Sequence, residues 1–316
     1  MEAKRTNVTT PHYNVAKKSV MQIVSHWIEK KLGYILLLPA LFVIGSIAFF
    51  PIIQTFWISL HHLNIKFANN KTFVGLENYI ELMKDERFLN SLSNTFLVTS
   101  ISVFLELLIG LAFALVMHRT FYGRGIVRAA ILVPWAIPTV VSALMWRYMY
   151  NDQLGVVNDI LYRLGLIDSY VTWLGSPGLS MSAVIVAEVW KTAPFMALLI
   201  LAGLQTIPGN LYEAAGIDGA NAFNKFFFIT LPLLKPAILV ALLFRTLDAF
   251  RIFDLVYVLT GGGPGNATEV ISMYAYKTMN GYLDFGYGSA ISVVIFVCVL
   301  LISFLFVKVL GTNVQR

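Results

Sequence analysis

Charged residues are scarce in this sequence. Only 13% of its 316 residues are Asp, Glu, Lys or Arg, whereas a soluble domain carries roughly 25%. Because 58% of the residues are hydrophobic, the chain has too little polar surface to cover a globule in water. The composition therefore excludes an ordinary soluble protein and predicts one that is embedded in a membrane.

Cysteine is nearly absent too, since Cys298 is the only one. One cysteine excludes a disulfide framework, a CxxC pair and a Cys/His zinc site. The adjacent His61 and His62 lack HExxH spacing, and no GxxxxGK[ST] phosphate loop occurs. No nucleophile–base set is evident. We therefore predict no catalytic residue, no metal site and no cofactor held by this chain.

Long apolar runs account for the hydrophobic excess. Six of them approach the roughly 20 residues that a helix needs to cross a bilayer, and they lie at 32–60, 93–117, 127–149, 181–204, 236–259 and 289–310. The predicted fold is therefore all-α, a six-helix transmembrane bundle. It comprises a basic tail at 1–31, a membrane domain at 32–310 and a short tail at 311–316.

Basic residues are distributed unevenly between the two sides of these spans. One side, with both termini and the loop 205–235, carries 13 of the 23 Lys and Arg residues, and the other side carries 6. Because cytoplasmic loops are enriched in Lys and Arg, both termini and this loop are predicted to be cytoplasmic. The same bias explains the net charge of +6, so no nucleic-acid partner is expected. The protein is predicted to lie in the lipid of the cell (inner) membrane.

Charged residues also occur inside the fifth apolar run. Arg245, Asp248, Arg251 and Asp254 follow one another at intervals of three, which places them as i,i+3 neighbours on a continuous helix. Each would cost roughly 2.5–3.5 kcal/mol near the bilayer centre if it faced lipid. They therefore form either a structural ion-pair ladder or the polar lining of a substrate path.

Two other spans carry acidic side chains. Glu188 and Lys191 have the same i,i+3 spacing in the fourth span, and a structural pair and a substrate contact are both open for them. Glu106 stands alone in the second span and is interpreted as a structural hydrogen-bonding group. Aromatic side chains, such as Phe244 and Tyr257, interleave with the fifth-span charges, an arrangement that suits either a sugar or helix packing.

The predicted cytoplasmic loop 205–235 has more pattern than a simple connection needs. A turn at Pro208-Gly209-Asn210 precedes one candidate helix, and Asp218-Gly219 separates it from a second, at 220–228. Apolar residues such as Phe223 exceed what a solvated loop requires. Such a patch marks a partner surface or packs against the chain's own helices.

This loop resembles the EAA motif of ABC importer permeases. The resemblance rests on Glu213-Ala214-Ala215, Gly219 and Ile229-x-Leu231-Pro232. In that family the loop docks into a groove of the ATPase subunit. The resemblance thus implies an ATPase-coupling role for a set of nine residues: Glu213, Ala214, Ala215, Asp218, Gly219, Ala220, Phe223, Leu231 and Pro232.

Further segments extend the resemblance to the sugar permeases of the type I ABC importers. Residues 187–196 and 244–254 look most similar to importers of the mycobacterial trehalose type. In related maltose permeases, sugar contacts lie at positions matching 244–252, although those permeases carry amides where this chain has Asp and Arg. The substrate path would then include Phe244, Arg245, Asp248, Arg251, Asp254, Glu188 and Lys191.

The resemblance implies a transporter subunit that is not an enzyme. Its partners would be a second, homologous permease, two ATPase subunits that bind ATP and Mg²⁺, and an extracytoplasmic solute-binding protein that delivers a sugar, trehalose or maltose. The alternative is a proton-coupled secondary transporter in which Asp248 or Glu106 titrates. A membrane enzyme would need a catalytic set that the sequence does not show.

Overall fold

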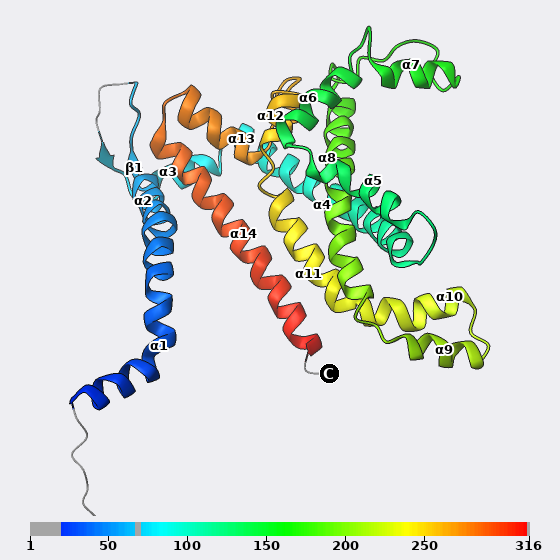
Figure 1. Ribbon diagram of the computed structural model, residues 1–316. Coiled ribbons are helices and arrows are strands. Elements are labelled where there is room, and N and C mark those ends of the chain that lie inside the picture. The colour runs from blue at the N-terminus through cyan, green and yellow to red at the C-terminus, as the bar shows by residue number, and fades with distance from the viewer. Residues whose placement is uncertain (1–19, 67–70, 315–316) are drawn as a thin grey trace, which may run out of the picture. The chain divides into compact units, whose positions relative to one another are not determined.

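A computed structural model describes residues 20–66 and 71–314, and helices make up most of them (Figure 1). The chain divides into two compact units, Met1–Gln54 and Thr55–Arg316. The first unit contains α1 (Val20–Ile44) and a π-helical turn, η1 (Gly45–Phe49). The helix α2 (Phe50–Ser59) then continues across the boundary between the units.

The first apolar run is helical, as predicted. A span-length apolar helix covers Lys31–Ser59, and side chains such as Leu37 and Phe42 are exposed on it. Such exposure is stable in lipid and unfavourable in water. The helix α1 already begins at Val20, within the predicted basic tail 1–31. Residues 1–19 of that tail and 315–316 of the C-terminal tail lie outside the described residues.

The second unit contains the other long helices. They are α4 (Glu86–His118), α8 (Pro177–Leu204), α11 (Leu231–Ala249) and α14 (Phe285–Val314). Among the described residues, five helices are long and apolar enough to cross a membrane, or six if one bent pair is counted as a single span. The all-α prediction is therefore confirmed, and the strands within residues 20–66 and 71–314 are limited to β1 (His61–His62) and β2 (Thr72–Phe73), a small antiparallel pair.

The helix α8 is the most deeply buried of the spans, and it packs against α4, α5 and α11. Glycines allow the close approach. A Cβ added at Gly110 of α4 would lie 2.7 Å from Met196 Cγ, and one at Gly203 of α8 would lie 2.4 Å from Ala237 Cβ. Small residues let backbones meet where helices associate in lipid, so these two positions fix how α4 and α11 lie against α8.

The predicted span 127–149 is not one straight helix. It consists of α5 (Arg124–Ala136) and α6 (Thr139–Met149), which are bent by 94°. The break falls at Ile137, whose ψ of 132° is extended. Because a residue that precedes proline avoids the α-helical region, Ile137-Pro138 ends α5.

The predicted span 236–259 is also interrupted. The helix α11 ends at Ala249, and α12 (Asp254–Leu259) begins after a turn. The turn and α12 bury Ile252, Leu255 and Val256 in an apolar cluster that also contains Trp146 of α6. Burial of these side chains stabilises the bend, and the prediction of a continuous helix here was wrong.

Short elements occupy both ends of the second unit (Figure 1). One end carries α3 (Glu77–Leu82), α7 (Val156–Arg163), α13 (Ile271–Tyr276) and η3 (Lys277–Gly281). The opposite end carries the last turns of α14 and three elements between α8 and α11. These are α9 (Gly209–Ile217), α10 (Ala222–Lys225) and the π-helical η2 (Phe226–Thr230).

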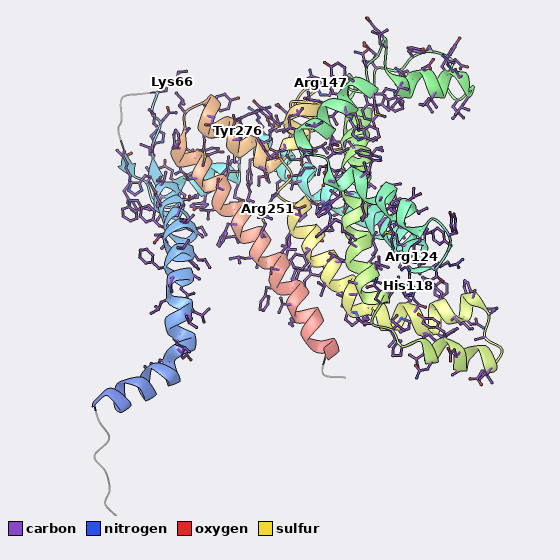
Figure 2. The ribbon with its side chains drawn as sticks, viewed as in Figure 1. Lys66, His118, Arg124, Arg147, Arg251 and Tyr276 are labelled. Carbon is purple, nitrogen blue, oxygen red and sulfur yellow. The ribbon has the colours of Figure 1, made fainter. Side chains whose placement is uncertain are left out.

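Several basic residues can be located relative to these two ends of the second unit. Figure 2 shows His118 and Arg124 toward the end that carries α9 and α10, Lys66 and Arg147 at the other end, and Arg251 between them. Arg124 and Arg128 both donate to the carbonyl of Met117 in the last turn of α4, at 2.8–3.1 Å. Cations at a helix C-terminus are favourable. Which end faces the cytoplasm stays a prediction.

Candidate functional site

A buried ion pair joins α4 to α11. The guanidinium of Arg245, 1% exposed, donates from Nε to Glu106 Oε2 at 2.6 Å and from an Nη atom to Glu106 Oε1 at 3.0 Å. Both side chains are fully enclosed by the second unit. Two parallel bonds between a guanidinium and a carboxylate combine charge with fixed geometry. Glu106 is therefore a structural hydrogen-bonding group, as the sequence predicted, but it does not stand alone.

The helix α8 completes this buried cluster. Glu188 Oε1 accepts from Arg245 at 3.0 Å, and the hydroxyl of Thr192 lies 2.6 Å from Glu106 Oε1. That hydroxyl also lies 2.6 Å from the backbone carbonyl of Glu188, one turn earlier. Residues of α4, α8 and α11 thus meet at one cation, which ties together the three helices that form the centre of the second unit.

Asp248 connects the buried cluster to open space. Its Oδ2 accepts from Arg245 at 2.5 Å, yet 65% of its side chain is exposed. It lines a polar cavity of about 150 Å³. The cavity is bounded by Thr139, Glu188, Lys191, Thr192, Asp248, Arg251, Ile252, Phe253, Asp254 and Leu255. We call this space the polar cavity.

The structure brings most of the predicted substrate-path residues together at the polar cavity. Glu188, Lys191, Asp248, Arg251 and Asp254 line it, although they come from two separate stretches of chain. Arg245 lies behind this lining rather than in it. Phe244 is 53% exposed and is not part of the lining, so its proposed place in the path gains no support from the geometry.

The ion-pair ladder predicted for 245–254 is only partly present. The pair Arg245–Asp248 forms, but the helix ends before the next rung. Arg251 instead donates to the backbone carbonyl of Leu247 at 3.1 Å, and Asp254 opens α12. Neither makes an ion pair with another described residue. The ladder stops after this first pair because i,i+3 contacts require a continuous helix.

Glu188 and Lys191 do not pair with each other either. Glu188 pairs with Arg245, whereas Lys191, 9% exposed, makes no ion pair or hydrogen bond within the described part of the chain. Since Lys191 lines the polar cavity, its three donors are available to a ligand there.

The loop with the EAA resemblance has the helix, glycine turn and helix that its sequence predicts. The amide of Ala220 donates to the carbonyl of Ala215 at 2.8 Å, which closes α9. Gly219 follows with φ of +78°, a left-handed conformation that glycine adopts without strain. Asn221 then caps α10 by accepting from the amide of Asn224 at 2.8 Å.

The surface of this loop is strongly apolar, and its second half belongs to the span-length apolar helix Ala222–Ala249. Ile217, Phe223, Phe227 and Phe228 are exposed, and the rings of Phe223 and Phe227 lie 4.4 Å apart. We call these four residues the loop patch. Most of the other predicted coupling residues are also exposed, whereas Ala215, Ala220 and Leu231 are partly buried. The adjacent rings of Phe223 and Phe227 form an exposed apolar surface, and such a surface marks an interaction site.

The base of the loop is fastened to the bundle. The hydroxyls of Tyr212 and Thr230 lie 2.9 Å apart, which links α9 to η2. Leu231 and Pro232 form the first turn of α11, where proline is tolerated. The contact therefore joins α9 to the residue that directly precedes α11, the helix that carries Arg245 and Asp248.

A second charged network, which sequence reasoning missed, lies at the opposite end of the unit. Arg87 binds Glu269 through two hydrogen bonds, at 2.6 and 2.9 Å, and Lys277 lies 2.8 Å from the same carboxylate. Glu269 is fully enclosed. Burial acts to raise the pKa of Glu269, but the hydrogen bonds and charges of Arg87 and Lys277 outweigh it and hold that pKa below its usual range.

Asp85 extends this network. It caps α4 by accepting from the amide of Arg87 at 2.9 Å, and it accepts from the hydroxyls of Tyr274 and Tyr287. Burial opposes ionisation, but these bonds lower the pKa of Asp85 overall. Arg87 and Glu269 are 182 residues apart along the chain. Partners at such a separation leave no local pattern in a sequence.

No metal centre accompanies these networks in the part of the chain that the structure describes. Within residues 20–66 and 71–314, no group of three or more His, Cys, Asp or Glu side chains is arranged to hold a metal ion.

Residues 106–316 match the family model described as "Binding-protein-dependent transport system inner membrane component". The chain is 50% identical over 281 residues to the trehalose/maltose transport system permease protein MalF of Thermococcus litoralis, covering 89% of this chain and 94% of that protein. It is 43% identical over 288 residues to the trehalose transport system permease protein SugA of Mycobacterium tuberculosis, covering 91% of each.

Solved structures agree on the fold. One chain of a bacterial ABC transporter that imports the acidic polysaccharide alginate superposes with a TM-score of 0.80 at 23% identity, covering 92% of this chain and 99% of that one. A second structure of the alginate transporter, in complex with a periplasmic protein carrying an alginate pentasaccharide, gives a TM-score of 0.77 at 24% identity. It covers 89% of this chain and 94% of that one.

Proposed function

Because this chain belongs to the family of binding-protein-dependent transport system inner membrane components, we propose that it lines the path by which a disaccharide enters the cell. It is a permease subunit of a sugar ABC importer and is not itself an enzyme. Two of its relatives are named for trehalose, one of them also for maltose. Trehalose or maltose is therefore the proposed substrate.

The polar cavity is the observation that carries this proposal. Lys191 and Arg251 offer donors, and Glu188, Asp248 and Asp254 offer acceptors, around one space. Each sugar hydroxyl can donate one hydrogen bond and accept others, so a wall that mixes both kinds of group suits a saccharide. Asp248 offers an exposed carboxylate that is held in place, because Arg245 binds its Oδ2 atom.

The size of the polar cavity supports a site shared with a second permease. Its volume of about 150 Å³ is below the range of about 300–1,000 Å³ that is usual for small-molecule pockets. A disaccharide needs more room than the polar cavity provides. We propose that the second, homologous permease supplies the remaining wall, and that a solute-binding protein delivers the sugar from outside.

ATP would act through the loop that contains Gly219. The loop patch is the proposed docking surface for an ATPase subunit, with Glu213 and the neighbouring coupling residues around it. Two ATPase copies would bind ATP and Mg²⁺, and this chain would need no cofactor of its own. Their motion would reach α11 through the Tyr212–Thr230 link and open or close the path by rigid-body rocking. The proposal therefore assigns the loop, and both termini, to the cytoplasm.

Proton-coupled transport is less well supported. It would need an acidic side chain free to bind and release a proton, whereas Glu106 is held by Arg245 and Thr192. Asp248 is also held on one side by Arg245. Neither carboxylate is therefore free of partners in this structure.

The proposal is tested by transport in proteoliposomes that contain both permeases and the ATPase, with ATP inside and the solute-binding protein outside. Asp248→Asn and Lys191→Met should each lower uptake of radiolabelled trehalose by about tenfold or more, because a hydrogen bond to a charged group is lost. Asp159→Asn is the matched control, since that carboxylate forms an exposed pair with Arg163 on α7. Normal uptake by both cavity variants, in intact complexes, would contradict the proposal.

A further inference from the structure

Three aromatic rings form a cluster beside the polar cavity. The ring centroid of Phe253 lies 5.3 Å from that of Tyr257 and 5.0 Å from that of Tyr276, and the two tyrosine rings are 5.6 Å apart. Phe253 and Tyr257 are stacked, with an angle of 24° between their planes. The rings come from the turn after α11, from α12 and from the end of α13. They are called the aromatic platform here.

The aromatic platform is continuous with the polar cavity. Phe253 belongs to both, since it lines the cavity and contacts the two tyrosines. Asp254, another lining residue, lies three positions before Tyr257 in α12, and residues at this spacing share a helix face. The interruption of the helix after Ala249 is what brings Phe253, Asp254 and Tyr257 to this position.

The side chains of Tyr257 and Tyr276 are only partly covered by the rest of the chain. Tyr257 is 46% exposed and Tyr276 is 41% exposed, and neither hydroxyl makes a hydrogen bond within the described residues. Figure 2 shows Tyr276 nearer than Arg251 to the end that carries Arg147. A solute that approached the polar cavity from that end would therefore meet these rings first.

The chemistry of a sugar ring matches this surface. One face of a pyranose ring presents C–H groups with a small positive charge, whereas the face of an aromatic ring is negative. Hydroxyls project from the edge of the sugar and need polar partners. An aromatic face that borders carboxylates and cations satisfies both requirements, as the platform and Asp254 do here.

We propose that Phe253, Tyr257 and Tyr276 form a stacking subsite for one pyranose ring of an uncharged disaccharide, adjoining the polar cavity that binds the other ring. This inference rests on the proposed function, because it assumes that the polar cavity holds sugar. It adds residues of α12 and α13 to the path. It also accounts for a disaccharide at a cavity of about 150 Å³, since the second ring lies outside that space.

The test is equilibrium binding of radiolabelled trehalose to the complete complex in lipid nanodiscs, without the solute-binding protein. Tyr257→Leu and Tyr276→Leu should each weaken binding by about three- to tenfold, because a stacking face is lost. Tyr257→Phe and Tyr276→Phe keep the ring and should bind as the wild type does. Tyr162→Leu is the matched control, because Tyr162 is also exposed and ring-paired, with Tyr170, but lies on α7.

Three outcomes would overturn the subsite. If both leucine variants bind trehalose normally while Asp248→Asn does not, the platform is refuted and the proposed function stands. If Asp248→Asn also binds normally, both fail. If the leucine variants lose the second permease during purification, the rings belong to the interface between permeases and are not a sugar subsite.

Discussion

Replacement of Arg245 by methionine should destabilise the second unit far more than any change at Asp248. The guanidinium is the partner of two enclosed carboxylates, Glu106 and Glu188, whose side chains are 0% and 7% exposed. Removal of one partner from a buried pair costs about 3–5 kcal/mol. In a unit of this size each kcal/mol lowers the melting temperature by roughly 2–4 °C, so Arg245→Met should lower it by about 6–20 °C.

Asp248→Asn provides the contrast within the same cluster. Its carboxylate is 65% exposed, and an exposed ion pair contributes only about 0–1 kcal/mol. Its melting temperature should therefore fall by less than about 4 °C. A triple variant, Arg245→Met with Glu106→Gln and Glu188→Gln, should recover most of the loss caused by Arg245→Met, because no uncompensated buried charge remains.

The assay is thermal unfolding of the purified complex in detergent, followed by fluorescence-detected size exclusion. A melting temperature of Arg245→Met within a few degrees of the wild type would refute the reasoning. So would equal losses in Arg245→Met and Asp248→Asn, because the buried and the exposed partner would then be equivalent.

Three further predictions concern other parts of the chain. The pKa of Glu269 is lower in the folded protein than in the unfolded chain. Its contribution to stability is therefore present above its pKa in the unfolded chain and is lost as the pH falls through its pKa in the folded protein. The melting temperature should therefore drop below about pH 4, and Glu269→Gln should flatten that drop. Gly219→Pro and Glu213→Lys should abolish ATP-driven uptake while membrane insertion, measured by blotting, stays normal; unaffected uptake would contradict docking at this loop. Gly110→Leu should reduce the yield of folded protein severalfold, since a side chain there would meet Met196 at 2.7 Å; a normal yield would show that α4 and α8 can move apart.

The sequence predicted the parts of the fold that depend on local pattern. Apolar runs identified the long helices because about 20 apolar residues are needed for each crossing. Turn chemistry at Asp218-Gly219 predicted the break between α9 and α10, because the conformation there favours glycine. Such features depend on neighbours within a few residues, so a single sequence contains them.

Other features depend on partners that are distant in the chain. Glu106 and Arg245 are 139 residues apart, and no periodicity connects them. The end of α11 at Ala249 was missed as well, because no proline or glycine occurs between Ala249 and Asp254. The bend is stabilised by burial of Ile252, Leu255 and Val256, and that burial is a property of tertiary packing.

The interruption after Ala249 changed the interpretation of the charged residues. A ladder and a substrate lining were alternatives on a continuous helix, but the structure divides the residues between the two roles. Arg245 is buried with Glu106 and Glu188, whereas Arg251 and Asp254 line the polar cavity. Asp248 belongs to both groups. Charge alone indicated that these residues face away from lipid, and only the bend decides which of them a solute can reach.

The source of energy is the most direct test of the account. The measurement is uptake of radiolabelled trehalose into proteoliposomes that contain this chain and the second permease, with the solute-binding protein outside. One set also contains the ATPase with ATP inside, and the other has a proton gradient and no ATPase. The account predicts accumulation in the first set, which Gly219→Pro should abolish, and none in the second. Accumulation driven by the proton gradient without the ATPase would contradict it.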